Sequence, residues 1–109
     1  MVVQIVNGYQ IERGAYLHGA DLTRAYLHSA FLPSANLNKA KMMGAVLHGA
    51  NLFEAKMIGA DLTDARLDNS NLEGANLSGA KMLRVNLTDA RMMGADLTGT
   101  ILTRACLYG

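Results

Sequence analysis

The sequence has one cysteine, one proline and no tryptophan among its 109 residues, and aromatic residues make up only 6% of it. The single cysteine, Cys106, excludes an internal disulfide and an all-cysteine metal site, so we expect a reducing, cytoplasmic setting. Neither sign of charge is in excess, because ten Lys and Arg are scattered among nine Asp and Glu. This balance favours neither a nucleic-acid-binding stripe nor an acidic tail.

Long apolar runs are absent as well. The apolar start Met1-Val2-Val3 has no basic residue before it and is broken by Gln4 and Asn7. Such a segment is neither a signal peptide nor a membrane span. We therefore expect a soluble protein, and the length of 109 residues predicts one domain.

What the sequence does have is a period of five. Every fifth residue from Leu17 to Leu107 is Leu or Met, nineteen times in succession, and an alanine stands two places before sixteen of them. On a helix, five residues advance the side chain by about 140° net, so these residues would not share one face. In a straight strand, an odd repeat places successive leucines on opposite faces. The chain must therefore turn once in each repeat.

Within each repeat, the Leu or Met and the alanine before it are predicted to point inward, and the other three places face solvent. Glycine occupies the last place in nine repeats, as a corner favours. Other residues also stand there, so we expect that the corner does not always require a positive φ angle. These residues include Arg24, Lys39, Glu54 and Arg84.

Three blocks show the unit clearly: ADLTR at 20–24, ANLFE at 50–54 and ANLSG at 75–79. They resemble the A(D/N)LxX unit of pentapeptide-repeat proteins, and the resemblance covers residues 15–109. It implies an all-β fold, a right-handed quadrilateral β-helix with four repeats per 20-residue coil, about 4.75 coils and about 23 Å in length. The inward alanine is replaced by Ser70, Val85 and Thr100. The usual Asp or Asn is replaced by Tyr16, Tyr26, Phe31, Val46, Ile101 and Cys106.

The two ends differ. Residues 1–14 lie outside the period and form an N-terminal cap, in which Asn7-Gly8 between two apolar stretches predicts a β-hairpin. The alternative is an irregular entry segment with Ile5 and Ile11 tucked onto the first coil. At the other end, Ile101, Cys106 and Tyr108 stand at outward places. Three interpretations remain open there: a homodimer through the C-terminal coil, a segment of a longer protein, and a monomer whose edge is blunted by its own side chains.

A 20-residue coil would stack positions 20 apart, which gives two candidate interaction surfaces. The first places Asp21, Lys41, Asp61 and Lys81 in a column of alternating charges that should attract one another, beside Met43 and Leu83. The second contains Phe31, Phe53 and Met93. The alternative for both is that half-exposed apolar side chains simply pack along the sheet.

A metal site is conceivable at His28, His48 and Asp68, which fall in one column, since imidazole and carboxylate groups bind zinc. Side chains that stand parallel on a sheet do not converge on one ion, however, and duplication of repeats explains the pair. We expect no metal and no cofactor. A tube filled with Leu, Met and Ala also offers no substrate pocket, so we expect no enzyme activity and no small-molecule substrate.

Three functions follow. The first is a rigid surface for a protein partner or for a second copy. The second comes from the resemblance, because some members of that family modulate DNA gyrase by imitating duplex DNA. A mimic should be strongly acidic, and the sequence has one acidic cluster, interrupted by Arg66: Asp61, Asp64, Asp68 and Glu73. The third is a passive segment of a larger protein. We expect neither direct nucleic-acid binding nor membrane contact.

Overall fold

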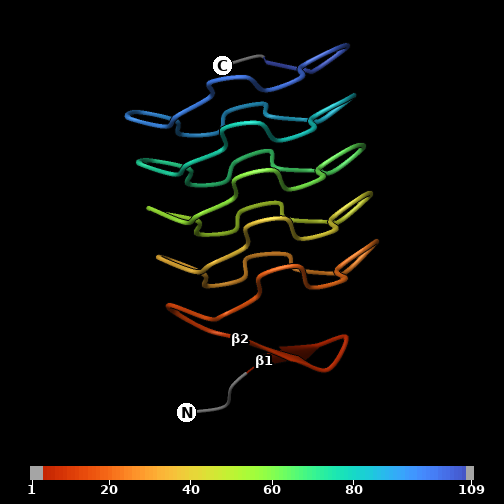
Figure 1. Cartoon of the computed structure of the whole chain (residues 1–109), viewed down its shortest axis with the longest axis vertical. Helices are drawn as coiled ribbons and strands as arrows, with labels where there is room; N and C mark the ends of the chain where they lie inside the picture. Colours follow the sequence, from red (N-terminus) through yellow and green to blue (C-terminus); the bar gives the residue numbers. More distant parts are fainter. Residues whose placement is uncertain (1–3, 108–109) are drawn as a thin grey trace.

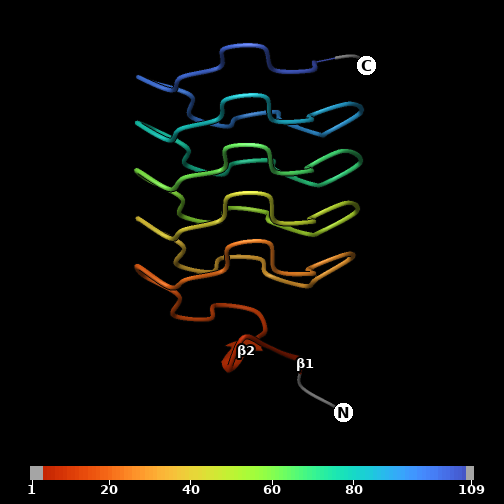
Figure 2. The ribbon, with the colours of Figure 1, turned by 90° about the vertical axis from the view of Figure 1, so that its right-hand side faces the viewer.

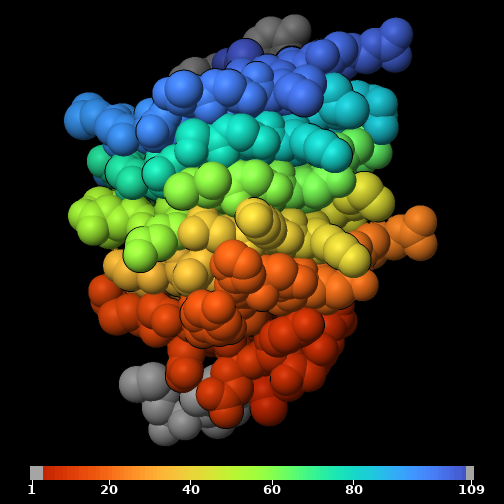
Figure 3. Space-filling model, viewed as in Figure 1, coloured from red at the N-terminus to blue at the C-terminus, as the bar shows by residue number. Residues whose placement is uncertain are grey.

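The computed structural model describes residues 4–107, which stack as coils from the N-terminal to the C-terminal end of a tower (Figures 1 and 2). The tower measures 36 × 23 × 20 Å. Parallel bridges join residues 20 apart, from Tyr16–Asn36 to Asn86–Cys106, so each coil contains four repeats. In the space-filling view the sequence colours lie in successive bands, and a lateral face therefore exposes residues from every coil (Figure 3).

A two-stranded antiparallel hairpin covers the first coil. Strand β1, Gln4–Val6, pairs with β2, Tyr9–Ile11. The turn residues Asn7 and Gly8 have φ angles of 52° and 82°, as a type I′ turn requires. Ile11 is buried against the coil, but Ile5 is 65% exposed. The hairpin thus closes the end through one face, and the expectation that Ile5 would tuck onto the coil is wrong.

The backbone hydrogen bonds explain why the chain keeps this path. In the second repeat, the N–H groups of Leu22 and Arg24 donate to carbonyls of the next coil, at 2.7 and 2.8 Å. Lys41 donates back to Ala20 at 2.8 Å, and Ala25 donates to Leu22 at 3.0 Å to close the corner turn. Because this pattern recurs in every repeat up to that of Met82 and Arg84, the sides of the coil are parallel ladders that use their own polar groups.

The inward places form the core. The largest fully buried side chains are the Leu and Met residues that recur every five positions from Leu22 to Leu77. Where a hydroxyl replaces alanine, it bonds to its own turn: Ser70 Oγ donates to the Leu67 carbonyl at 2.6 Å, and Thr100 Oγ1 donates to Leu97 at 3.0 Å. Both hydroxyls are thus satisfied within their own repeats.

The corners overturn one prediction. Every corner residue from Gly19 to Arg104 has a positive φ angle, whether or not it is glycine. The non-glycine residues that had suggested a corner without a positive φ angle have φ angles between 53° and 60°: Arg24, Lys39, Glu54 and Arg84. The closed coil imposes this angle, since the corner turn and two ladder bonds must form in every repeat. Those bonds offset the cost of about 1–2 kcal/mol that a left-handed L residue carries.

Outward Asn and Asp residues brace the straight side of each repeat. Asn51 Oδ1 accepts the N–H of Phe53, and Asn86 Oδ1 accepts that of Thr88, both at 3.0 Å. Lys56 occupies the same place in its repeat but has no acceptor atom. The N–H of Ile58 donates instead to Asn38 Oδ1 of the preceding coil, at 2.8 Å. The Asp or Asn of the repeat is therefore an acceptor for a backbone donor that the ladders leave unused. Among residues 4–107, no helix has the length and apolar character needed to span a bilayer.

Candidate interaction surfaces

We call the first candidate surface the Asp21 face. Its main column runs through four successive coils as Asp21, Lys41, Asp61 and Lys81, each bridged to the next. The second column of this face contains Thr23, Met43, Thr63 and Leu83, and the adjoining corner column contains Arg24, Gly44, Asp64 and Arg84. The structure therefore places the charged and apolar residues of the prediction side by side.

The charges of the main column do not pair with one another. Asp21 Oδ1 accepts the N–H of Thr23 at 3.1 Å. Hydrogen bonding by the side chain and the backbone of Thr23 lowers the pKa of Asp21. Asp61 Oδ1 accepts both the N–H and the hydroxyl of Thr63, at 3.1 and 2.6 Å. Within the described chain, Lys41 and Lys81 form no ion pair. The predicted attraction thus produces no ion pairs here, because the carboxylates turn toward neighbouring threonines. Both lysines stay exposed.

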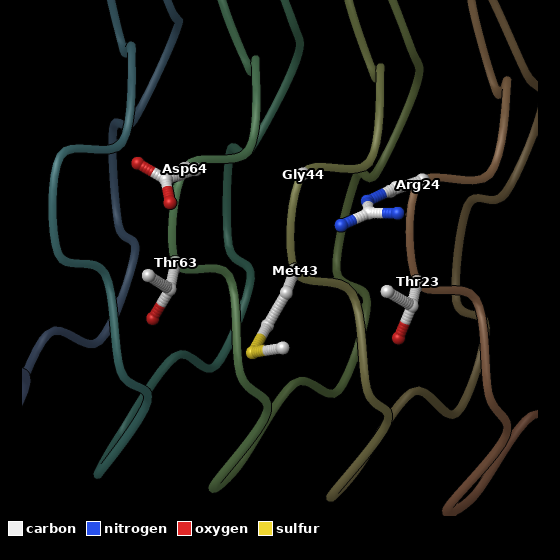
Figure 4. A pocket seen from close by; sticks show the side chains of 6 residues that line it. All are labelled: Thr23, Arg24, Met43, Gly44, Thr63 and Asp64. Carbon is white, nitrogen blue, oxygen red and sulfur yellow. The ribbon is translucent and has the colours of Figure 1, made fainter.

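A groove of about 240 Å³ lies on this face beside Met43, which is 44% exposed. Its lining comes from three successive coils: Thr23, Arg24, Met43, Gly44, Thr63 and Asp64. Figure 4 shows the Met43 side chain between the two threonines, and the Arg24 guanidinium extending toward the coil of Gly44. Since Gly44 has no side chain, the space beyond Arg24 stays open.

The two ends of the groove differ in charge. Arg84 donates to Asp64 through Nε and Nη2, at 2.6 and 2.9 Å, and this pair keeps the pKa of Asp64 below its usual value. The Asp64 charge is thereby neutralised within the chain. Arg24 forms no ion pair among the described residues. The groove therefore offers an unpaired cation, a methionine and threonine hydroxyls to a partner.

The second candidate surface is less continuous than predicted. Phe31 and Phe53 are 50% and 40% exposed, and the Arg13 guanidinium carbon lies 5.2 Å from the centre of the Phe31 ring. Met93, 81% exposed, stands two coils beyond Phe53 in the same column. Between them lies Glu73, which is ion-paired with Arg91. The two phenylalanines thus lie on adjoining columns of one face, one coil apart, and the charged Glu73 separates Met93 from Phe53.

A polar network on a third face was missed by sequence reasoning. The buried Asp68 carboxylate oxygen Oδ2 bonds to His48 Nδ1 at 2.6 Å and accepts from Arg66 Nη2 at 3.0 Å. Burial raises the pKa of Asp68, but the hydrogen bonds from Arg66 and His48 outweigh burial and lower it. The other oxygen, Oδ1, is buried without a partner. The available signal was the 20-residue spacing of His48 and Asp68, combined with Arg66 two places before.

The histidines do not surround a common point. The His28 and His48 rings are stacked, with centroids 5.1 Å apart and planes 3° from parallel. Their nitrogens therefore cannot converge on one ion together with Asp68. Among residues 4–107, no group of three His, Cys, Asp or Glu side chains has the arrangement of a metal site. His18 lies on another face, stacked on Tyr16.

Two of the three residues predicted for a dimer end, Ile101 and Cys106, lie on lateral faces. Ile101 is 46% exposed and continues the main column of the Asp21 face above Lys81. Cys106 is half-buried, and its Sγ lies 3.3 Å from Thr88 Oγ1. Tyr108 is outside the described residues. Neither Ile101 nor Cys106 points along the tower axis, since both stand at outward places of a repeat.

The predicted acidic cluster does not exist as a surface. Asp61 and Asp64 lie on and beside the Asp21 face, Asp68 on the third face and Glu73 on the face of Phe53. Three of the four carboxylates are paired with arginines: Asp64 with Arg84, Asp68 with Arg66 and Glu73 with Arg91. The chain turns at each corner, so these residues lie on different faces although they are close in the sequence.

Four-sided coils with a filled core, and a hairpin as the only named strands among residues 4–107, define a β-solenoid repeat protein. A family model described as pentapeptide repeats matches in eight copies between residues 13 and 109, so the chain belongs to the pentapeptide-repeat family and is a right-handed β-helix. No curated protein sequence matches it.

Two solved structures show the same fold. A pentapeptide repeat protein from the Arabidopsis thaliana thylakoid lumen is 33% identical with a TM-score of 0.80, over 82% of this chain and 62% of that one. Rfr23, a pentapeptide repeat protein from the cyanobacterium Cyanothece 51142, is 34% identical with a TM-score of 0.52, over 80% of this chain and 63% of that one. The chain thus spans under two thirds of the length of both.

Proposed function

We propose that this protein is a non-enzymatic interaction protein that presents the Asp21 face of its rigid β-helix to a protein partner. Two properties of the tower suit this role. Its core is filled by inward side chains, and its surface is a set of stacked columns in which each residue has a fixed neighbour 20 positions away. Repeat towers use such extended faces for binding.

The observation that carries the proposal is the groove beside Met43, on a face whose exposed lysines, Lys41 and Lys81, form no ion pair among the described residues. Methionine is enriched at the centres of interfaces, and polar residues form their rims. Lys41 and Lys81 border the half-exposed Met43 and the partly buried Leu83. The groove and these unpaired lysines therefore lie on the same face.

The test compares two double variants, one on each of two opposite faces. The first, Lys41→Glu with Met43→Ser, changes the Asp21 face, and the second, Phe31→Ser with Phe53→Ser, changes the opposite side of the coil. Proteins cross-linked to the wild-type chain in cell extract should be lost with the first variant and kept with the second. Retention of every partner by both variants would contradict the proposal and support a passive structural segment instead.

DNA mimicry toward gyrase is supported less well. The formal net charge is +1, and the carboxylates that could form an acidic surface lie on different faces, most of them paired with arginine. A surface that imitates duplex DNA needs a continuous negative field. We expect no effect of micromolar protein in a gyrase supercoiling assay, and inhibition there would restore this alternative.

A further inference from the structure

We infer that the Asp21 face binds a second copy of this chain, with the two towers antiparallel. The inference rests on the proposed function, since it names the partner of the same face. It comes from the order of charge in the main column, which reads negative, positive, negative, positive through four coils. When two such columns are placed side by side in opposite directions, each negative charge lies opposite a positive charge.

The pairing follows from a two-fold axis that lies in the plane of the face, perpendicular to the tower, between the coils of Lys41 and Asp61. Such an axis sets each column opposite itself in reverse order. Asp21 then faces Lys81 of the second copy, and Lys41 faces Asp61. The symmetry repeats both contacts, so all four charges of each copy meet an opposite charge.

Only this orientation and register place all four charges of each copy opposite a charge of the other sign. If the second tower were parallel, the charged column would face the column of Thr23 and Met43 instead of charges. If the antiparallel tower slipped by one coil, Lys41 would face Lys41 of the second copy, and Asp21 would face Asp61. Like charges placed opposite each other suppress wrong arrangements more strongly than correct pairs add affinity.

The groups that the arrangement needs are available in the single chain. Lys41 and Lys81 are exposed and form no ion pair within the described residues, and each aspartate uses only Oδ1 for its threonine. In the second column, Met43 meets Thr63, and Leu83 meets Thr23, so larger and smaller side chains alternate across the contact. At the corner, Arg24 lies opposite Arg84, whose charge is balanced by its ion pair with Asp64, and Asp64 lies opposite Gly44.

The corresponding columns of the other faces lack this pattern. They read Tyr16, Asn36, Lys56, Asn76, Asp96; Tyr26, Val46, Arg66, Asn86; and Phe31, Asn51, Asn71, Arg91. Four charges of alternating sign in successive coils are therefore specific to the Asp21 face. Four coils give a contact about 19 Å tall, smaller than a standard protein interface, so the dimer should be weak and sensitive to salt.

Two double variants with the same composition and net charge provide the test. Asp21→Lys with Lys81→Asp makes the column read Lys, Lys, Asp, Asp, which remains complementary to its reverse. Asp21→Lys with Lys41→Asp makes it read Lys, Asp, Asp, Lys, which places like charges opposite each other at every contact. The second variant has more opposite-charge neighbours within its own column, so its fold should be the less disturbed of the two.

Sedimentation equilibrium at 50 and 500 mM NaCl measures the outcome. We expect a dimer for the wild type and for Asp21→Lys/Lys81→Asp, and a dissociation constant at least about tenfold higher for Asp21→Lys/Lys41→Asp and for the wild type at high salt. Equal association of both variants, or a monomer in every case up to the highest concentration, would overturn the inference. The proposed function would survive either result if the cross-linked partner proteins still depend on Lys41 and Met43.

Orientation is tested separately by cross-linking in a Cys106→Ser background. A Thr23→Cys chain and a Leu83→Cys chain should be joined by a short bismaleimide when mixed, because these positions face each other. Each chain alone should not cross-link, since two copies of Thr23 would lie three coils apart, about 14 Å along the tower. Efficient cross-linking of either chain with itself would exclude the antiparallel arrangement.

Discussion

Glu54 leans over Gly74 of the next coil. Its Cγ lies 3.0 Å from the position that a Cβ on Gly74 would occupy, and Gly74 has a φ angle of 69°. Arg24 bears the same relation to Gly44, at 3.4 Å. A large corner residue thus uses the space that its successor in the column would need, so the choice of residue at one corner constrains the next.

We expect Gly74→Ala to destabilise the protein by about 2–3 kcal/mol, because the new methyl group meets Glu54 at a left-handed position. The matched control is Gly79→Ala, which has nearly the same φ angle, 67°, and no neighbouring atom within 4 Å. Its cost should be about 1 kcal/mol. Urea denaturation gives both values, and equal losses would show that the contact with Glu54 has no energetic weight.

Asp68→Asn should destabilise the protein by about 1–3 kcal/mol at pH 7, because it weakens charged hydrogen bonds from Arg66 and His48 at a buried site. The pKa of Asp68 is lowered below its unfolded value of 3.8. A lowered folded pKa adds stability above the unfolded pKa, and this stability is lost as pH falls through the folded pKa.

The difference between wild type and Asp68→Asn should therefore be full above about pH 5 and shrink below about pH 4. Urea denaturation between pH 3 and pH 7 measures it. Asp89→Asn serves as the control, since Asp89 is exposed and forms no ion pair among the described residues. A difference that stays constant with pH would show that the Asp68 charge does not contribute.

Leu62→Ala should cost about 2–5 kcal/mol, because Leu62 has no exposed surface and a cavity would remain in the tube. Leu62→Met should cost less than about 1.5 kcal/mol. Methionine already fills the equivalent place at Met42 and Met82, one coil before and after. Thermal unfolding compares the two variants, and a cost for Leu62→Met as large as for Leu62→Ala would contradict an exchangeable core.

Asn51→Ala removes the acceptor for the N–H of Phe53, which we expect to cost about 0.5–1.5 kcal/mol. Asn51→Asp keeps an acceptor oxygen, and Asp61 already plays this part toward Thr63. That second variant should stay within about 0.5 kcal/mol of the wild type. Equal stability of all three proteins in chemical denaturation would assign the Asn and Asp preference to some other cause.

The period of five predicts the inward Leu, Met and Ala columns, because these depend only on where side chains point. The 20-residue coil was implied by the resemblance to pentapeptide-repeat proteins. The φ angle of Lys39 could not be read in the same way, since it is imposed by closure of the whole coil. The spacing of Asp21 and Lys41 placed them as neighbours, but whether they would form an ion pair depended on competition from the nearby Thr23 backbone. For Asp68, the decisive partner Arg66 belonged to the same repeat and was counted only as an interruption of acidic residues.

The ladder spacing of 20 residues sets how the surface of this protein can change. Loss or gain of one repeat would keep every inward leucine inward, yet it would turn all later residues by a quarter of the circumference. Lys81 would then leave the side of Asp21 and Lys41 for a neighbouring side. A change of 20 residues would only lengthen each column. The core is therefore preserved when the length changes by five residues, whereas a surface built from several coils is preserved only when it changes by twenty.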